Sequence, residues 1–261
     1  MTTRLLPRTF AALAVAGAVA AGVPAVSTAA PAPAISVGPG TKLAFLGEQL
    51  APGEYKVEGA CTLGWIAQDA SGKKFGLTQG HCGKAGTKVG VDKYIVGTVV
   101  KGEWDPSKES VAPERATFVN GPVTPATVDS GTRYLGTLGA SSDWGVIEFG
   151  AKVPVRGSRG AINPSGVGTA RTGDPVCAEG ITTGRKCGKV LAVRGNWILT
   201  DVQSRPGDSG GPLIRTSDNA AIGLTSGIYG FEVEKNKFAI IGSTAYDLGA
   251  TLRNAGLTLV K

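Results

Sequence analysis

Short apolar runs, separated by turn-forming residues roughly every ten positions, constrain the fold of this chain more than any other feature. The 40 Gly and 15 Pro residues, about a fifth of the 261 positions against about 12% in average usage, supply most of these turns. This rhythm is typical of β-sandwiches and barrels, so we expect an all-β fold. The expected strands are Lys42–Leu46, Cys61–Ala67, Lys74–Thr78, Tyr94–Lys101, Thr117–Asn120, Trp144–Phe149, Lys189–Val193, Trp197–Asp201, Pro212–Arg215, Ala220–Ser226 and Lys237–Thr244.

A single helix is expected near the end of the chain. Leu248 and Leu252 lie one turn apart, and Gly256 follows them as a stop signal. Either Ser243 or Thr244 is the expected N-cap, because a hydroxyl there can accept a hydrogen bond from the first helical turn.

The chain divides into four segments by composition. Residues 1–29 have the pattern of a secretory signal peptide, and residues 30–40 are a lead-in or a short pro-segment. Two β-rich halves follow, at 41–150 and 151–261, and the second includes the helix. The stretch Gly150–Gly168, rich in Gly, Ser and Arg, is the expected crossing between them.

The first 29 residues predict export. Arg4 and Arg8 precede an apolar run from Phe10 to Val26, and small residues up to Ala29 provide a cleavage site. An uncleaved membrane anchor is the alternative, although Pro24 interrupts the run. No later segment is long and apolar enough to span a membrane, so we expect a secreted, extracellular protein.

The charge and the composition limit the possible partners. Of 27 Lys and Arg residues two lie in the leader, and 20 Asp and Glu oppose the rest, so the mature chain carries +5. A modest positive charge predicts either association with anionic cell-wall polymers or solubility alone. The basic residues are scattered rather than clustered with aromatics, which argues against nucleic-acid binding. We expect a monomer without a cofactor or a metal ion.

The four cysteines predict two disulfides, because an exported protein folds in an oxidising compartment. Four cysteines allow three pairings, and the short loops favour Cys61–Cys82 and Cys177–Cys187. A zinc site is the alternative, but no pair has the two-to-four-residue gap that such sites use.

The most specific motif is the run from Pro206 to Pro212, Pro-Gly-Asp-Ser-Gly-Gly-Pro. Glycines on both sides of Ser209 allow a tight turn, in which the backbone N–H groups of Gly207 and Ser209 can converge on a developing oxyanion. An ordinary polar turn is the alternative for this motif taken alone.

Two further motifs carry a histidine and an aspartate. His81, the one histidine of the chain, follows an apolar strand and Gly80 and precedes a cysteine, so its ring would be held stiffly. Asp143 begins an apolar strand, where its carboxylate can be buried against an imidazole. Taken alone, His81 could have a purely structural role. The Asp143 motif taken alone is also weak, because Asp105 and Asp129 lie near turns as well.

These three motifs, in this order, resemble the chymotrypsin-like serine endopeptidases, especially the bacterial secreted branch of the streptogrisins and alpha-lytic protease. The segments Val176–Gly188 and Gly223–Gly227 are similar to the disulfide hairpin and the substrate-lining strand of that branch. The resemblance implies two six-stranded antiparallel Greek-key barrels, with the active site in the cleft between them and a helix at the C-terminus.

The resemblance also implies a role for each residue. Ser209 is the expected nucleophile, His81 the general base and acid, and Asp143 the group that orients the imidazole. An extended peptide substrate would add to the strand edge at Ser226, Gly227 and Ile228. Gln203 would lie at the base of the specificity pocket and favour small or apolar side chains, with Asp201 close by.

One departure from the family concerns Asp208. Ala178 stands where the bacterial relatives often place an arginine, so we expect Arg185 or Arg205 to pair with the Asp208 carboxylate. A carboxylate without a partner there would distort the oxyanion site. The alternative function is therefore a catalytically weak or inactive protein of this fold that acts as an extracellular binding module.

Overall fold

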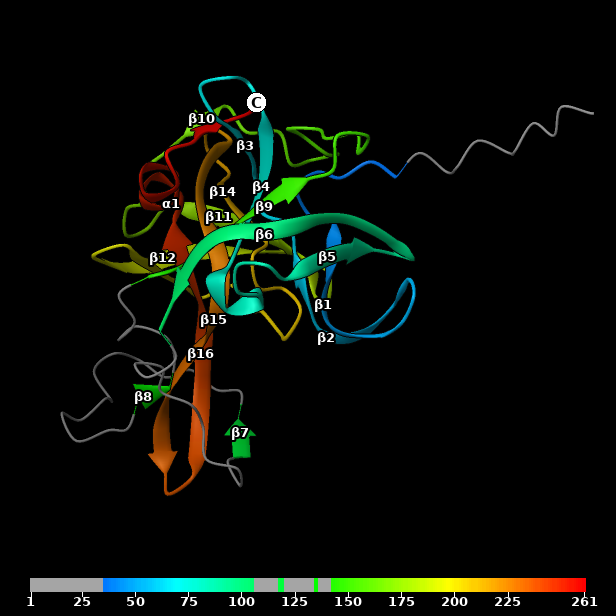
Figure 1. The fold of residues 1–261 in the computed structure, drawn as a ribbon. Coiled ribbons are helices and arrows are strands. Elements are labelled where there is room, and N and C mark those ends of the chain that lie inside the picture. Colours follow the sequence, from blue (N-terminus) through cyan, green and yellow to red (C-terminus); the bar gives the residue numbers. More distant parts are fainter. Residues whose placement is uncertain (1–34, 106–116, 120–133, 136–141) are drawn as a thin grey trace, which may run out of the picture. The chain divides into compact units, whose positions relative to one another are not determined.

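The computed structural model describes residues 35–105, 117–119, 134–135 and 142–261, which are arranged mainly as β-strands (Figure 1). A first sheet has the strand order β17-β3-β4-β9-β6-β5-β1-β2. Its strands are β1 (Lys42–Ala51), β2 (Glu54–Thr62), β3 (Ile66–Gln68), β4 (Lys74–Thr78), β5 (Lys88–Val91), β6 (Tyr94–Trp104), β9 (Asp143–Phe149) and β17 (Thr258–Leu259).

The second sheet closes on itself. Strand β15 pairs with β14 on one edge and with β16 on the other, so six strands form a barrel in the order β15-β14-β11-β12-β13-β16. The prediction of an all-β double-barrel fold is confirmed. The strands are β10 (Gly166–Val167), β11 (Pro175–Gly180), β12 (Gly184–Arg194), β13 (Trp197–Thr200), β14 (Pro212–Arg215), β15 (Ala220–Glu234) and β16 (Lys237–Asp247).

Three short strands join the sheet formed by the other half of the sequence. β17, at the end of the chain, pairs with β3 of the first sheet. β7 (Thr117–Val119) and β8 (Tyr134–Leu135) lie between β6 and β9 in the sequence, yet they pair with β16 and β15. Figure 1 shows them beside the long β15–β16 hairpin.

Several expected strands have other bounds in the structure; β12, for example, begins at Gly184 and β15 extends to Glu234. The strand expected at Lys42–Leu46 is longer, because β1 runs to Ala51 and pairs with β2 in a long hairpin. The expected strand Cys61–Ala67 is split, because the N–H groups of Thr62, Leu63 and Gly64 donate to Ser209, Thr41 and Leu77 rather than to one neighbouring strand.

The core explains why β9 is apolar along nearly its whole length. All of its residues except Glu148 are buried, because the strand lies between β4 and β6 and is covered on both faces. Trp65, wholly buried, donates its indole N–H to the Gly223 carbonyl of β15 at 2.9 Å, and this bond joins the two sheets.

The helix α1 (Leu248–Ala255) lies where the sequence predicts it, but its N-cap is Asp247. The Asp247 carboxylate accepts a hydrogen bond from the Ala250 N–H at 2.7 Å, and burial raises the pKa of this carboxyl. Ser243 and Thr244, the expected caps, belong to β16 because they pair with β13. Gly256 ends the helix with φ of 72°, as predicted. Within the described residues, no helix has the length and hydrophobicity of a membrane span.

Candidate active site

His81 lies on a single 3-10 turn, η1 (Gly80–Cys82), directly after β4. A side chain at position 80 would collide with the backbone carbonyl of Glu103, so only glycine allows the turn to approach β6 this closely. Cys82 is bonded to Cys61 at the end of β2. The turn is therefore anchored on both sides of the histidine, and the His81 side chain is 25% exposed.

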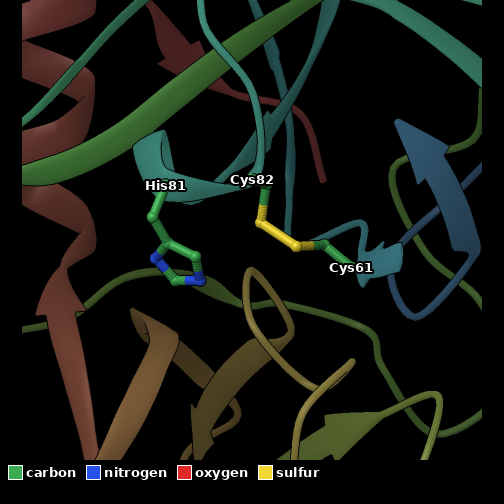
Figure 2. A group of neighbouring side chains, drawn as sticks. All are labelled: Cys61, His81 and Cys82. Carbon is green, nitrogen blue, oxygen red and sulfur yellow. A yellow bond between two sulfur atoms is a disulfide. The ribbon is translucent and has the colours of Figure 1, made fainter. Parts of the chain in front are cut away.

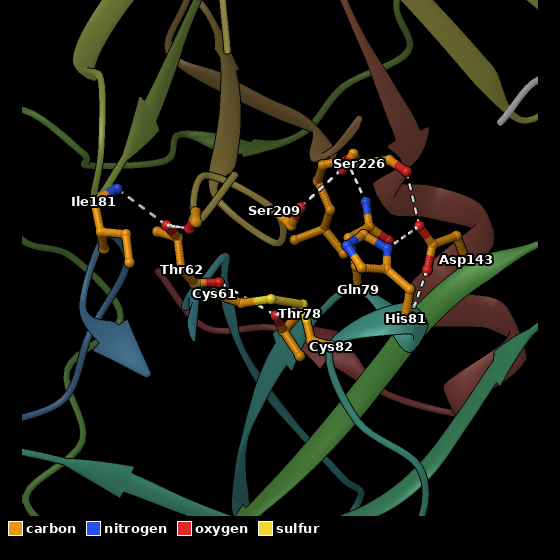
Figure 3. The surroundings of a disulfide bond; sticks show 12 residues. Cys61, Thr62, Thr78, Gln79, His81, Cys82, Asp143, Ile181, Ser209 and Ser226 are labelled. Atoms are coloured by element: carbon orange, nitrogen blue, oxygen red, sulfur yellow. Dashed lines mark hydrogen bonds and ion pairs between the residues drawn. A yellow bond between two sulfur atoms is a disulfide. The ribbon is translucent and has the colours of Figure 1, made fainter. Parts of the chain in front are cut away.

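Asp143 lies at the start of β9 and its side chain is wholly buried. Its Oδ2 is 2.8 Å from Nδ1 of His81, and its Oδ1 accepts the His81 backbone N–H at 3.0 Å (Figure 3). The Ser226 hydroxyl donates to the same Oδ2 at 2.7 Å. A carboxylate held in this way keeps the proton on Nδ1 and directs Nε2 away from itself.

Ser209 is joined to this network through Ser226. Its hydroxyl donates to the Ser226 carbonyl oxygen at 2.9 Å, while the Ser226 side chain contacts Asp143. His81 and Ser209 also line one cavity of about 650 Å³, which extends past the Cys61–Cys82 disulfide and includes the exposed Trp104. The structure thus brings the three predicted residues together.

The backbone around Ser209 is suited to bind an oxyanion. Gly207 and Gly210 have φ of 102° and 85°, a region in which residues with side chains are strained. The Asp208 N–H donates to the Arg205 carbonyl, and the Gly211 N–H donates to the Asp208 carbonyl, which closes a tight turn. The N–H groups of Gly207 and Ser209 donate to no acceptor among the described residues, so two donors are open at this turn.

Asp208 is 2% exposed, and its partners differ from those expected. Its carboxylate accepts the backbone N–H groups of Thr182, Thr183 and Arg205 and the Thr183 hydroxyl. Arg205 thus contributes its backbone and not its guanidinium, and Arg185 lies 3.7 Å from Glu179 instead. Backbone amides of the β11–β12 turn take the place of the expected cation.

Thr62, at the end of β2, connects the first sheet to the nucleophile turn. Its hydroxyl donates to the Gly207 carbonyl at 2.8 Å, and its N–H donates to the Ser209 carbonyl at 2.7 Å. Thr62, Thr182 and Thr183 could not be predicted from the sequence, because threonines in strands and turns are common. The one available signal was that Thr62 follows a cysteine.

The residues expected to bind substrate lie in two places. Ser226, Gly227 and Ile228 follow one another in β15, and Ser226 has the additional contact with Asp143. Gln203 is exposed and lines a different cavity of about 800 Å³, together with Lys186 and Arg205. Asp201, the other residue considered for the pocket base, accepts the backbone N–H of Lys189.

One group of potential metal ligands lies beside the nucleophile turn. Cys61, His81 and Cys82 have ligand atoms within 4.8 Å of one another (Figure 2). The two sulfurs are bonded to each other, so neither is a thiolate, and this group does not fit a metal ion. Both predicted disulfides, Cys61–Cys82 and Cys177–Cys187, are present.

The two disulfides have separable effects. Replacing Cys61 and Cys82 together by Ala is expected to lower the free energy of unfolding by about 3 kcal/mol, and also to lower kcat because it releases the turn that carries His81. The Cys177 and Cys187 double replacement is the comparison; it should lower stability and lower kcat less, because this disulfide joins β11 to β12 and does not hold the turn that carries His81. Urea denaturation and steady-state kinetics measure both, and equal kcat losses would contradict the positional role of the first disulfide.

No model of a known protein family matches the sequence. Over 185 residues the chain is 29% identical to "Serine protease 2" of Streptomyces fradiae, across 65% of this chain and 87% of that protein. It is 26% identical over 239 residues to "Uncharacterized protein Rv1815" of Mycobacterium tuberculosis, across 87% and 88% of the two chains.

The fold is similar to that of solved bacterial proteases. Thermobifida fusca Protease A gives a TM-score of 0.55 at 23% identity, over 87% of this chain and 99% of that one. Nocardiopsis protease gives 0.55 at 22% identity, over 87% and 100%. The alpha-lytic protease homolog N4 gives 0.52 at 21% identity, over 86% and 100%.

These similarities confirm the resemblance that the three motifs carry. The chain shares a recognisable part of its sequence with a Streptomyces serine protease and has the fold of the bacterial enzymes. The chain is therefore similar in sequence to a bacterial serine protease and in fold to the bacterial chymotrypsin-like proteases, among them an alpha-lytic protease homolog, and these similarities support a serine endopeptidase activity.

Proposed function

We propose that this protein is a secreted endopeptidase that hydrolyses peptide bonds through Ser209, His81 and Asp143 and an acyl-enzyme intermediate. The observation that carries the proposal is the buried Asp143 carboxylate, which contacts the backbone N–H and the ring Nδ1 of His81. His81 and Ser209 also line the same cavity. The apolar leader with its two arginines and the two disulfides support secretion.

In the first half of the reaction, Ser209 Oγ attacks the substrate carbonyl carbon and gives its proton to Nε2 of His81. The hydroxyl must first turn from the Ser226 carbonyl, to which it donates in this structure. The Asp143 carboxylate stabilises the imidazolium that forms. The substrate oxygen gains a negative charge and accepts hydrogen bonds from the N–H groups of Gly207 and Ser209.

The second half releases both products. The imidazolium of His81 protonates the leaving amine, the C–N bond breaks, and the acyl group remains on Ser209. Water then attacks the acyl carbon with His81 again as the base, the bond to Ser209 Oγ breaks, the carboxylic acid product leaves, and His81 returns a proton to Ser209. The acyl side of the substrate would lie along β15 at Ser226, Gly227 and Ile228, bound through main-chain hydrogen bonds.

A binding module without turnover is the other function considered. A buried Asp208 carboxylate without a partner would favour it, because it would distort the oxyanion site. The Asp208 carboxylate accepts four hydrogen bonds in the structure, so the lack of a cation beside it does not favour a binding module.

A fluorophosphonate probe tests the proposal, because it reacts only with a serine that a base has activated. We expect one label per folded molecule, located on Ser209 by mass spectrometry, and cleavage of an unstructured protein such as casein. Folded protein that takes up no label would refute the proposed function.

The rate should depend on pH through His81. We expect kcat/KM to rise as the imidazole loses its proton, roughly between pH 6 and 8, because a protonated ring cannot accept the Ser209 proton. The rate of fluorophosphonate labelling, which needs the same proton transfer, should follow the same curve. A flat profile over this range would exclude His81 as the base.

A further inference from the structure

All hydrogen bonds to the Asp208 carboxylate come from uncharged donors. Its Oδ1 accepts the N–H groups of Thr182 at 2.8 Å and Thr183 at 3.1 Å. Its Oδ2 accepts the Thr183 hydroxyl at 2.8 Å and the Arg205 N–H at 2.9 Å. A carboxylate offers about four lone-pair positions, so no position is left for a lysine, an arginine or a chain-terminal ammonium.

The neighbouring threonine acts on the adjacent peptide group. The Thr182 hydroxyl donates to the Pro206 carbonyl oxygen at 2.8 Å. In a planar trans peptide the C=O of Pro206 and the N–H of Gly207 point in opposite directions. The bond from Thr182 on one side therefore directs the Gly207 N–H to the other side.

The Pro206–Gly207 peptide group is the less constrained of the two that supply the oxyanion donors. Gly207 has φ of 102°, and its two flanking peptide planes can rotate because glycine imposes no side-chain restriction. An atom added at its Cβ position would lie 2.5 Å from the Thr182 hydroxyl oxygen, so the two residues pack closely. The Ser209 N–H, by contrast, is oriented by the Gly211 bond to the Asp208 carbonyl.

We infer that Thr182 and Thr183 are positioning residues, which hold the Gly207 N–H in its oxyanion-binding orientation and bind Asp208 without any cation. This inference rests on the proposed function, because it concerns the same oxyanion site. Thr182 orients the peptide group directly, and Thr183 acts through the Asp208 side chain. The turn between β11 and β12 thus supports the oxyanion site, whose donors lie on the nucleophile turn.

Thr182→Val tests the direct contact, because valine has the shape of threonine but cannot donate. We expect kcat to fall about 10- to 100-fold, the range that follows a small misplacement of a reacting group. KM should stay within about twofold, because the ground-state carbonyl needs the Gly207 donor much less than the oxyanion does. Affinity for a peptide aldehyde, which forms an oxyanion on Ser209, should fall by the same factor as kcat.

Three variants separate positioning from a merely structural role. Thr182→Ser keeps the hydroxyl and should restore kcat to within about threefold of the wild type. Thr258→Val is the matched control, since it removes an exposed threonine hydroxyl that donates to the Gln68 carbonyl, and it should leave kcat unchanged. Thr183→Val should lower kcat as Thr182→Val does, and it tests the second threonine even if one of the two variants fails to fold.

The outcomes distinguish this inference from the proposed function. Wild-type protein without fluorophosphonate labelling would refute the function itself. A labelled wild type with an unchanged kcat in folded Thr182→Val, or with equal losses of affinity for the aldehyde and for a product peptide, would overturn the inference alone.

Discussion

Ser209→Ala is expected to abolish covalent labelling by a fluorophosphonate and to lower kcat by roughly a million-fold, the scale seen when a triad nucleophile is removed. The Ser209 Oγ is the atom that becomes acylated, so its removal leaves the site without its nucleophile. Single-turnover assays on a peptide ester measure the residual rate.

Ser204→Ala is the matched control for this change. Ser204 lies on the same loop, five residues before the nucleophile, and lines the separate cavity with Gln203. Its replacement should leave both labelling and kcat at the wild-type level. Labelling that persists in Ser209→Ala would mean that another residue is the nucleophile and would contradict the proposed mechanism.

Asp143→Asn is expected to lower kcat by about 10⁴-fold with little change in fold. The carboxylate accepts three donors, the N–H and Nδ1 of His81 and the hydroxyl of Ser226. An amide of the same shape has one oxygen and one NH₂ group, and the NH₂ group would face a donor. His81 then adopts the other tautomer, with the proton on Nε2, and cannot accept the Ser209 proton.

The comparison with Asp174→Asn separates this effect from a general loss of charge. Asp174 accepts the Arg171 N–H at 2.9 Å and pairs with Arg215 at 3.1 Å, on a part of the second sheet outside the cavity. That variant should keep its kcat and lose at most a little stability. If Asp143→Asn lowered the rate no more than Asp174→Asn, Asp143 would not be the orienting residue.

Local patterns predicted the elements that depend on local chemistry. β9 is apolar because it is covered on both faces, and Gly256 ends α1 because its positive φ favours glycine. The predicted N-cap of the helix was wrong, because strand pairing and not local chemistry decides where the helix begins. Ser243 and Thr244 are good capping residues by type, but pairing with β13 keeps them in β16, so the helix starts only after Asp247.

The candidate site shows the same division. His81, Asp143 and Ser209 could be predicted as site residues from the sequence, because each stands in a short motif with a glycine, a cysteine or an apolar strand at a fixed distance along the chain. Thr62 and Thr182 could not be predicted in this way. Each acts across a large separation in the sequence, and its bond to the nucleophile turn exists only after the strands have paired.

By itself, the sequence determined the all-β class, the two disulfides and the three residues that carry the proposed chemistry, because turn residues, cysteine spacing and short motifs are local properties of a chain. Only the tertiary structure decided which donors bind the Asp208 carboxylate, which cavity Gln203 lines and which strands complete each sheet. Those outcomes depend on the directions of backbone N–H and C=O groups far apart in the sequence, and these directions are set when the two sheets form.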